Sequence, residues 1–148
     1  MKIVKASDTD LQTILDLQYI AYQSEAKLFN SQDIPPLKQT IREVYDEFCK
    51  GIILKAVDNG AIIGSVRAYS KNGTVYIGKL MVHPTCQGRG IGTKLLAEIE
   101  KYYPYGRYEL FTSTRSIKNI QMYERLGYNA FKEKEVKDNL RFVYLEKV

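Results

Sequence analysis

The order of apolar and polar residues in the first part of the chain predicts one strand and two helices. Residues 2–5 alternate as a strand does, and residues 7–10 offer capping oxygens for a helix that ends near Glu25. The apolar positions of this helix recur at helical spacing and are Leu11, Leu15, Tyr19 and Tyr22. Residues 29–36 are predicted to be a loop because Pro35 and Pro36 oppose a helix, and a second helix then runs to Gly51.

Three strands are predicted next, at residues 52–58, 61–70 and 74–82. They are rich in β-branched and apolar residues, and the pairs Asn59-Gly60 and Asn72-Gly73 that separate them are favoured in hairpin turns. The pattern therefore predicts an antiparallel meander. Gly78 interrupts the third strand, and a lone glycine in a strand indicates a bulge or the close approach of another backbone.

The second half of the chain alternates helices with strands. A helix over residues 93–103 carries its apolar residues on one stripe, a strand follows at residues 107–112, and a helix that begins at Ser116 ends at Gly127. Residues 128–132 and 140–146 form the last two strands. This order predicts an α+β fold, with about four helices flanking a mixed, mostly antiparallel central sheet.

Composition narrows the class of protein. The 148 residues contain no long linker, repeat or low-complexity run, so we expect one domain over residues 1–148. Cys49 and Cys86 lack metal-type spacing and His83 is the only histidine, which predicts no metal site and reduced thiols in a cytoplasmic protein. We expect neither a signal segment nor a membrane span. The net charge of +5 is scattered among acidic residues, which disfavours a nucleic-acid surface.

A glycine-dense turn follows the third strand of the meander. It consists of Gln87, Gly88, Arg89, Gly90, Ile91 and Gly92, and Thr93 continues it into a helix. Glycines at steps of two leave backbone N–H groups unshielded, and the helix adds the positive end of its dipole, so the turn suits a diphosphate. The spacing fits neither the nucleoside-triphosphate loop nor the Gly-x-Gly-x-x-Gly dinucleotide fingerprint.

Two blocks of the sequence resemble one family. The pattern Gln87-x-x-Gly90-x-Gly92 after an apolar strand resembles the coenzyme A loop of the GCN5-related N-acetyltransferase (GNAT) family. The segment from Ser116 to Tyr128 is similar to the second conserved block of that family, a helix that carries a tyrosine and closes on a glycine and an aromatic residue. The blocks occur in the right order, with room between them for one helix and one strand.

The resemblance implies roles for individual residues. Acetyl-CoA is the expected cosubstrate, with its pantetheine arm lying like an added strand along Leu80, Met81 and Val82. A backbone N–H near Leu80 or Met81 is expected to polarise the thioester carbonyl. The hydroxyl of Tyr123 is expected to protonate the departing thiolate, the alternative being that Tyr123 is an aromatic core residue.

Two roles stay open at this stage. The family often has an asparagine seven residues before the tyrosine, and here that position is Ser116, so Asn119 is a candidate contact with the coenzyme and Ser116 a candidate N-cap. Residues 75–82 contain no carboxylate, although many members of the family use one there as a general base. The amine proton is therefore left to His83, to Glu25 or to water.

The acceptor amine is expected among the first helix, the loop over residues 29–36 and the middle strands. The candidate residues are Tyr19, Tyr22, Glu25, Phe29, Arg67 and Tyr69. Aromatic walls suit an amine on an apolar or extended carrier, and Arg67 equally suits a carboxylate. At least half of the tyrosine stripe on the helix fits a core instead.

We therefore interpret the sequence as an N-acetyltransferase that moves the acetyl group of acetyl-CoA to a primary amine, carried by a small molecule or a peptide. The amine attacks the thioester directly in a ternary complex, so proximity supplies much of the rate. The alternative is a non-catalytic acyl-CoA-binding sensor or interaction module of the same fold. A homodimer would agree with the resemblance, but the sequence leaves the oligomeric state open.

Overall fold

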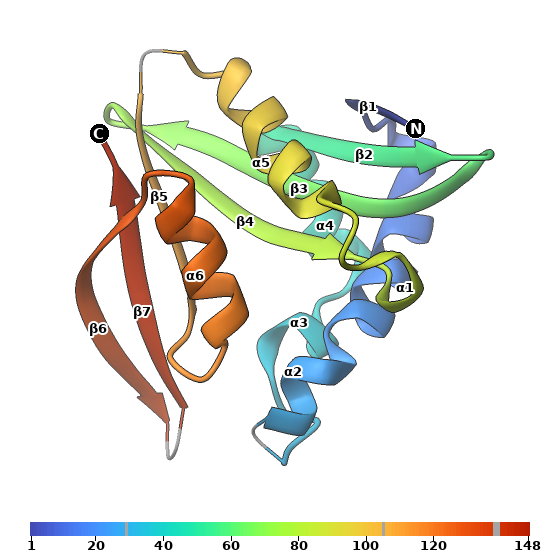
Figure 1. The fold of residues 1–148 in the computed structure, drawn as a ribbon. Coiled ribbons are helices and arrows are strands. Elements are labelled where there is room, and N and C mark those ends of the chain that lie inside the picture. Colours follow the sequence, from blue (N-terminus) through green and yellow to red (C-terminus); the bar gives the residue numbers. More distant parts are fainter. Residues whose placement is uncertain (29, 105, 138–139) are drawn as a thin grey trace.

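A computed structural model describes residues 1–28, 30–104, 106–137 and 140–148. The strands of these residues form one sheet in the order β1-β2-β3-β4-β5-β7-β6, in which β4 and β5 run parallel and the other neighbours antiparallel (Figure 1). The strands are β1 (Lys2–Lys5), β2 (Ile52–Asp58), β3 (Ala61–Lys71), β4 (Thr74–Val82), β5 (Arg107–Ser113), β6 (Asn129–Lys137) and β7 (Leu140–Lys147). The predicted α+β fold with a mixed, mostly antiparallel sheet is confirmed.

The helices follow the predicted order with two differences near the N-terminus. They are η1 (Asp8–Asp10), α1 (Leu11–Ala21), α2 (Gln23–Leu28), α3 (Pro35–Lys38), α4 (Ile41–Lys50), η2 (Pro84–Cys86), α5 (Ile91–Lys101) and α6 (Ile117–Arg125). The first helix does not end near Glu25, because the chain continues after Tyr22 as α2. Pro35 and Pro36 begin α3 instead of lying in a loop, since the first turn of a helix does not need their missing N–H groups.

The hairpin turns of the meander are as predicted. Asn59 and Gly60 have φ values of 51° and 79°, and Asn72 and Gly73 have 52° and 81°. Two consecutive residues with positive φ make a type I′ turn, whose twist matches that of the flanking strands. The turns thereby fix the register of β2, β3 and β4.

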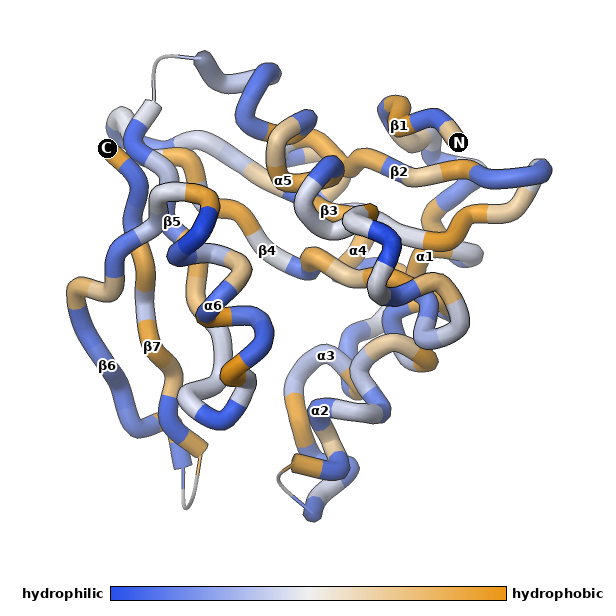
Figure 2. Tube along the Cα trace, in the orientation of Figure 1, coloured by the Kyte–Doolittle hydropathy of each residue, from blue (hydrophilic) through white to orange (hydrophobic). Residues whose placement is uncertain are grey.

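Helices cover both faces of the sheet. α1 and α4 pack on one face, where Ile53 and Met81 join the apolar side of α1. α5 and α6 cover the other face, where Leu95, Ile99 and Tyr123 belong to the larger core. Figure 2 shows hydrophobic segments along β2, β3 and α5, whereas β6 is mostly hydrophilic.

The apolar face of α4 is only partly buried. Val44 is fully buried and Phe48 packs against the α1 core, but Ile41 and Tyr45 are exposed. Thr40 begins this helix with a capping box, in which its hydroxyl accepts from the N–H of Glu43 and the Glu43 carboxylate accepts from the N–H of Thr40. Capping therefore contributes to α4 alongside burial.

β4 and β5 separate after a short parallel contact. The register joins Thr74, Val75 and Tyr76 to β5, and no later residue of β4 pairs with β5 in the part of the chain that the structure describes. We call the region beside Ile77–Val82 the β4–β5 opening. In Figure 1 the two strands diverge here, and α6 lies over their separating ends.

A bulge interrupts β4 at the start of this opening. Gly78 pairs with Arg67 and Met81 pairs with Ser65, so Lys79 and Leu80 stand opposite a single residue of β3. Lys79 has φ 51°, a left-handed backbone conformation that residues other than glycine rarely adopt. The predicted irregularity at Gly78 is confirmed, one residue further along the strand.

The end of α6 fixes the position of Tyr123. Gly127 has φ 96° and follows the helix, the N–H of Tyr128 donates to the carbonyl of Tyr123 at 3.0 Å, and the N–H of Gly127 donates to the carbonyl of Glu124 at 3.1 Å. These two bonds are those of a Schellman motif. The predicted glycine stop of the helix is confirmed.

β6 forms one edge of the sheet, with its side chains exposed along its whole length. Its middle reads Lys132, Glu133, Lys134 and Glu135. Helices long and apolar enough to cross a membrane are absent from the described ranges. Across the same residues, no three His, Cys, Asp or Glu side chains gather as a metal ion would require.

Candidate functional site

The chain leaves β4 through a turn that His83 caps. The Nδ1 atom of His83 accepts from the N–H of Thr85 at 3.2 Å and lies 2.9 Å from the Thr85 hydroxyl. Its backbone N–H donates to the carbonyl of Ile63. The only histidine is thus held in the turn by Thr85, a structural role.

The glycine turn after this cap presents backbone to solvent. Gly88 and Gly90 have φ values of 79° and 77°, and a Cβ atom added at either would meet no other atom within 4 Å. Glycine is therefore required by the backbone conformation, not by crowding within the protein. Open space beside a left-handed backbone leaves room for a ligand to approach the N–H groups of this turn.

The first turn of α5 adds further backbone donors to the candidate anion site. The first bond within the helix runs from the N–H of Lys94 to the carbonyl of Gly90 at 3.1 Å. The N–H groups of Ile91, Gly92 and Thr93 precede this bond, at the positive end of the helix dipole. A Cβ at Gly92 would meet Met122 of α6 at 3.6 Å, so the site lies where α5 and α6 meet.

The side chains of the turn have different environments. Those of Gln87, Arg89 and Lys94 are exposed and Thr93 is half-buried, while Ile91 is buried in the larger core and can reach a ligand only through its backbone. Arg89 pairs with Asp58 at 3.2 Å and would have to exchange this exposed partner for a phosphate. The predicted loop residues thus come together chiefly as a row of backbone donors.

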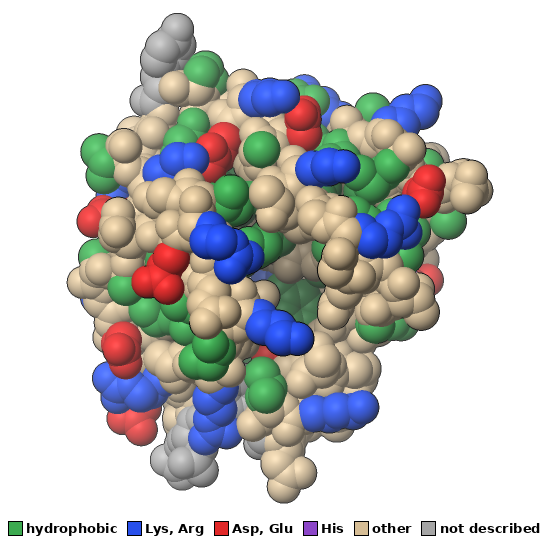
Figure 3. Space-filling view, in the orientation of Figure 1, with side chains coloured by type: hydrophobic (Ala, Val, Ile, Leu, Met, Phe, Trp, Pro, Cys, Tyr) green, Lys and Arg blue, Asp and Glu red, His purple; other side chains and the backbone are tan. Residues whose placement is uncertain are grey.

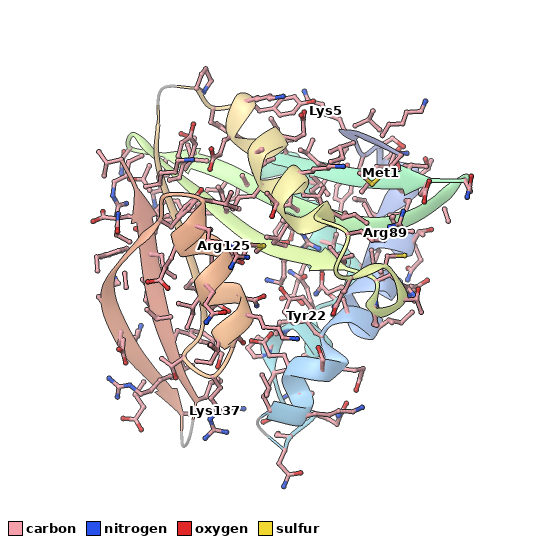
Figure 4. All side chains as sticks on the ribbon, viewed as in Figure 1. Met1, Lys5, Tyr22, Arg89, Arg125 and Lys137 are labelled. Atoms are coloured by element: carbon pink, nitrogen blue, oxygen red, sulfur yellow. The ribbon has the colours of Figure 1, made fainter. Side chains whose placement is uncertain are left out.

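Basic side chains flank a hollow in front of this turn. Figure 3 shows Lys and Arg side chains around a depression between α5 and α6 on one side and the ends of α1 and α2 on the other. Figure 4 places Arg89 and Arg125 on opposite sides of it. Arg125, which forms no ion pair with any described residue, was missed at the level of sequence, although it lies two residues after Tyr123 in the same block.

The backbone of β4 lines the same region through the β4–β5 opening. Met81 is buried on the α1 side, whereas Leu80 and Val82 pack toward the α5 side. Leu80 directly follows the left-handed Lys79, so the bulge sets the direction of its N–H. Leu80, Met81 and Val82 therefore lie as the sequence predicted, along a strand edge that β5 leaves.

Tyr123 lies at the inner side of α6. Its side chain is 6% exposed and its ring centroid is 6.1 Å from that of Tyr128. Burial and, secondarily, the charge of Glu25 raise the pKa of its phenol, so it carries its proton at physiological pH. Its side chain is thus part of the larger core and keeps its proton, and its role as a proton donor stays a prediction.

Glu25 and Tyr22 lie near enough to Tyr123 for these groups to shift one another's pKa. Burial raises the pKa of the Glu25 carboxyl, with the charge of Lys79 opposing the shift. Burial, Glu25 and Tyr123 together raise the pKa of Tyr22. Figure 4 places Tyr22 between α2 and α6. Three predicted site residues thus form one cluster, which we call the Tyr22–Glu25–Tyr123 cluster.

Arg67 is buried beside this cluster in a polar network. It donates to Gln18 Oε1 at 2.6 Å and to Gln39 Oε1 at 3.1 Å, and it pairs with Glu47. Its Nε atom is buried and has no partner among the described residues. The hydroxyl of Tyr19 donates to the carbonyl of Gln39 and so braces the same network.

The remaining predicted site residues lie away from the Tyr22–Glu25–Tyr123 cluster or outside the described residues. Tyr69 stacks on Tyr76 at 5.2 Å and carries Lys50 over its ring, at the end of α4, so its contacts are not with the cluster. Asn119 is exposed and donates to Thr112 Oγ1 at 3.4 Å, and Ser116 is the N-cap residue of α6 without a side-chain capping bond. Phe29 lies outside the described residues.

Lys79 lies beside the candidate site, although it was not predicted from the sequence. Its side chain is half-buried, and the loss of water around the ammonium group lowers the pKa of Lys79. The nearby charge of Arg67 also lowers this pKa, whereas the charges of Glu47, Glu25 and Glu43 raise it. The available signal was a lysine inside an otherwise apolar strand, directly after the glycine that marked the bulge.

Residues 11–128 match the family model described as the Acetyltransferase (GNAT) family. The chain belongs to this family. The resemblance of the two sequence blocks is therefore confirmed, and the protein is an acetyltransferase of the acetyl-CoA-dependent GNAT type. A search among curated protein sequences gives no significant match.

Solved structures share the fold at low identity. The ribosomal-protein-S18-alanine N-acetyltransferase from Escherichia coli has a TM-score of 0.81 at 14% identity, over 99% of this chain and 92% of that one. The PaiA N-acetyltransferase from Thermoplasma acidophilum, in complex with coenzyme A, has 0.78 at 18%, over 99% and 97%. A GNAT acetyltransferase from Elizabethkingia anophelis with acetyl-CoA bound has 0.71 at 18%, over 99% and 96%.

Proposed function

We propose that the protein transfers the acetyl group of acetyl-CoA to a primary amine by direct attack within a ternary complex. One observation supports this most strongly: the β4–β5 opening connects the N–H groups at the start of α5 with the Tyr22–Glu25–Tyr123 cluster. A ligand that extends along the opening would have its anionic end at one and its reacting end at the other.

The proposed position of acetyl-CoA follows from this arrangement. Its diphosphate accepts from the N–H groups of residues 88–93, with Arg89 and Arg125 at hand as cations. Its pantetheine arm lies beside Leu80–Val82, where β5 supplies no partner. Structural neighbours that carry coenzyme A or acetyl-CoA support the choice of ligand.

The chemistry then needs three groups of this chain. The neutral amine attacks the thioester carbon, and the N–H of Leu80 donates to the carbonyl oxygen as negative charge develops on it. The carbon–sulfur bond breaks, and the phenol of Tyr123 gives its proton to the departing thiolate. The new nitrogen–carbon bond leaves one surplus proton on nitrogen.

Glu25 is the proposed acceptor of that proton. It lies in the cluster, and its raised pKa makes it a stronger base than an ordinary carboxylate. His83 is held in the turn by its bonds with Thr85. Among the three proton acceptors that the sequence left open, the surroundings of Glu25 favour it.

A thiol-release assay tests the function. Acetyl-CoA is mixed with the protein and with a panel of amines, amino acids, polyamines and peptides, and free coenzyme A is measured against time. Release that depends on an amine supports the proposal. Tight binding of coenzyme A by calorimetry without release for any amine would support the non-catalytic sensor instead.

A further inference from the structure

Lys79 is the charged residue beside the proposed thioester position for which the mechanism above has no use. It occupies the bulge directly before Leu80, in a left-handed backbone conformation that is unfavourable for most residues other than glycine. Burial of its ammonium group adds a second cost. Strain and burial at one residue indicate a function for it more often than a packing role.

The Lys79 side chain reaches a hollow beside the site. This hollow has a volume of about 400 Å³ and lies between the α3–α4 segment and the ends of β6 and β7. Gln39 and Glu43 line one wall, and Val136 and Leu140 line the other. Its size falls within the range of small-molecule sites.

The other charges around the hollow already have partners. Lys38 and Lys137 both pair with Asp33. The carboxylate of Glu43 accepts from the N–H and the hydroxyl of Thr40 at 2.9 and 3.0 Å, as part of the capping box. Lys79 has neither an ion pair nor a hydrogen bond with any residue that the structure describes.

Arg67 is a second cation near Lys79, outside the residues that line the hollow. It pairs across the sheet with Gly78, one residue before Lys79, and is 5% exposed. Two of its nitrogens are occupied by Gln18, Gln39 and Glu47, while the buried Nε has no partner among the described residues. Buried polar atoms without a partner are rare, and a bound ligand is one way to satisfy them.

We propose that the hollow binds a carboxylate of the acceptor, with Lys79 as its cationic partner, so that the substrates are small amines that also carry a carboxylate. This inference rests on the proposed function and specifies its substrate class. A bound carboxylate neutralises the ammonium group of Lys79 and leaves the amino group of the same molecule within a lysine side chain's length of Leu80.

Matched substrate pairs test the inference. Amino acids and their carboxamides, such as glycine and glycinamide or β-alanine and β-alaninamide, present the same amine with and without the carboxylate. Thiol release is measured for each pair with the wild type, Lys79→Met, Lys79→Arg and Lys71→Met. Comparing variants on one substrate removes the difference in amine pKa within each pair. Lys71 is an exposed lysine at the end of β3 and is the control.

We expect kcat/KM of the wild type, calculated for the neutral form of each amine, to favour the acid of each pair. Lys79→Met should lower kcat/KM for the acids by about tenfold to a hundredfold, the loss expected for one hydrogen bond to a charged group. The amides should change less than about twofold under the same principle. Lys79→Arg should keep most of the preference, and Lys71→Met should behave as the wild type.

Other outcomes overturn the inference. If the wild type uses acids and amides equally, or if Lys79→Met keeps the preference, the hollow does not bind the carboxylate although the acetyltransferase function stands. If Lys79→Met slows acids and amides alike and arginine does not restore the rate, Lys79 acts on the amine or on the fold.

A binding experiment covers the case in which no amine reacts. The protein saturated with coenzyme A is titrated calorimetrically with N-acetylglycine and with N-acetylglycinamide. Acid binding that weakens about tenfold in Lys79→Met, with unchanged binding of the amide, supports the carboxylate site even if the proposed reaction fails. Equal binding of both compounds to the wild type overturns it.

Discussion

Glu25 and Tyr123 lie close enough across the β4–β5 opening for the charge of the Glu25 carboxylate to raise the pKa of the Tyr123 phenol. The two residues belong to α2 and α6, and they influence each other in the region where β4 and β5 are unpaired. The proposed base and acid of the reaction are thus coupled through the gap that the substrates would occupy.

Tyr123→Phe should bind coenzyme A as the wild type does and lower kcat about a hundredfold, because it removes only the proton donor for the thiolate. Calorimetry and thiol release measure the two effects. Tyr128→Phe is the matched control, since its hydroxyl donates to Glu100 at 2.7 Å and faces no substrate. It should lower the free energy of unfolding by about 1 kcal/mol and leave kcat unchanged. Equal rates in Tyr123→Phe and wild type would remove the phenol from the mechanism.

Glu25→Gln should change the dependence of the rate on pH. Only the ionised carboxylate accepts a proton, so kcat/KM of the wild type should rise with pH through the pKa of Glu25, which burial places above the ordinary carboxyl range. We call this rise the acidic limb of the pH profile. It should be missing in Glu25→Gln, whose rate should rise only as the free amine loses its proton near a pKa of about 10. Initial rates from pH 5 to about 10 give both profiles.

His83→Gln is the control for that profile. Because His83 caps the turn after β4, its loss should reduce stability without moving the acidic limb. A limb that survives in Glu25→Gln but disappears in His83→Gln would make the histidine the base. A limb that survives in both would assign the proton to water.

Gly90→Asp should abolish most coenzyme A affinity, because it places a side chain with a negative charge against the proposed diphosphate. Gly73→Asp provides a close control. Gly73 also has a positive φ, 81° against 77°, and also has no atom within 4 Å of an added Cβ. Both variants should lose about 1 to 2 kcal/mol from backbone strain, but only the first should lose affinity in calorimetry. Equal affinities would contradict the role of the turn.

Arg67→Met should lower the free energy of unfolding by about 2 to 3 kcal/mol, since it leaves Gln18 and Gln39 without a charged donor. Glu47 is partly exposed and can return to water, which keeps the loss below that of a fully buried pair. Urea unfolding measures the change. Arg141→Met breaks an exposed pair with Glu133 and should cost less than about 0.5 kcal/mol.

The order and type of most elements could be predicted because local signals agreed with each other. Asn-Gly pairs marked the hairpins, Gly127 marked the end of α6, and the glycines at 88 and 90 marked the start of α5, all through backbone conformations that favour glycine or asparagine. The errors lie where two signals compete. A Pro-Pro pair can lie after a helix or in the first turn of one, and in this chain it begins α3.

The site was less predictable because it depends on contacts between distant segments. Arg67 is separated by 49 residues from Gln18, and nothing local indicates that they meet. Lys79 was not predicted from the sequence; it lies in the bulge of β4 and lines a hollow together with residues of α3 and α4. The glycine turn could be predicted without knowledge of distant contacts, because consecutive residues determine its backbone conformation.

The alternating charges of β6 restrict how two copies of the chain can meet. In an antiparallel pairing of this edge with its own copy, opposite residues project to the same face and so have numbers of the same parity. Lys132 and Lys134 are even, and Glu133 and Glu135 are odd. Within residues 132–135 a lysine could therefore stand opposite another lysine but never opposite a glutamate, so no register supplies stabilising Lys–Glu pairs, and like charges that face each other destabilise the pairing. The exposed edge thereby carries its own protection against aggregation through strand addition.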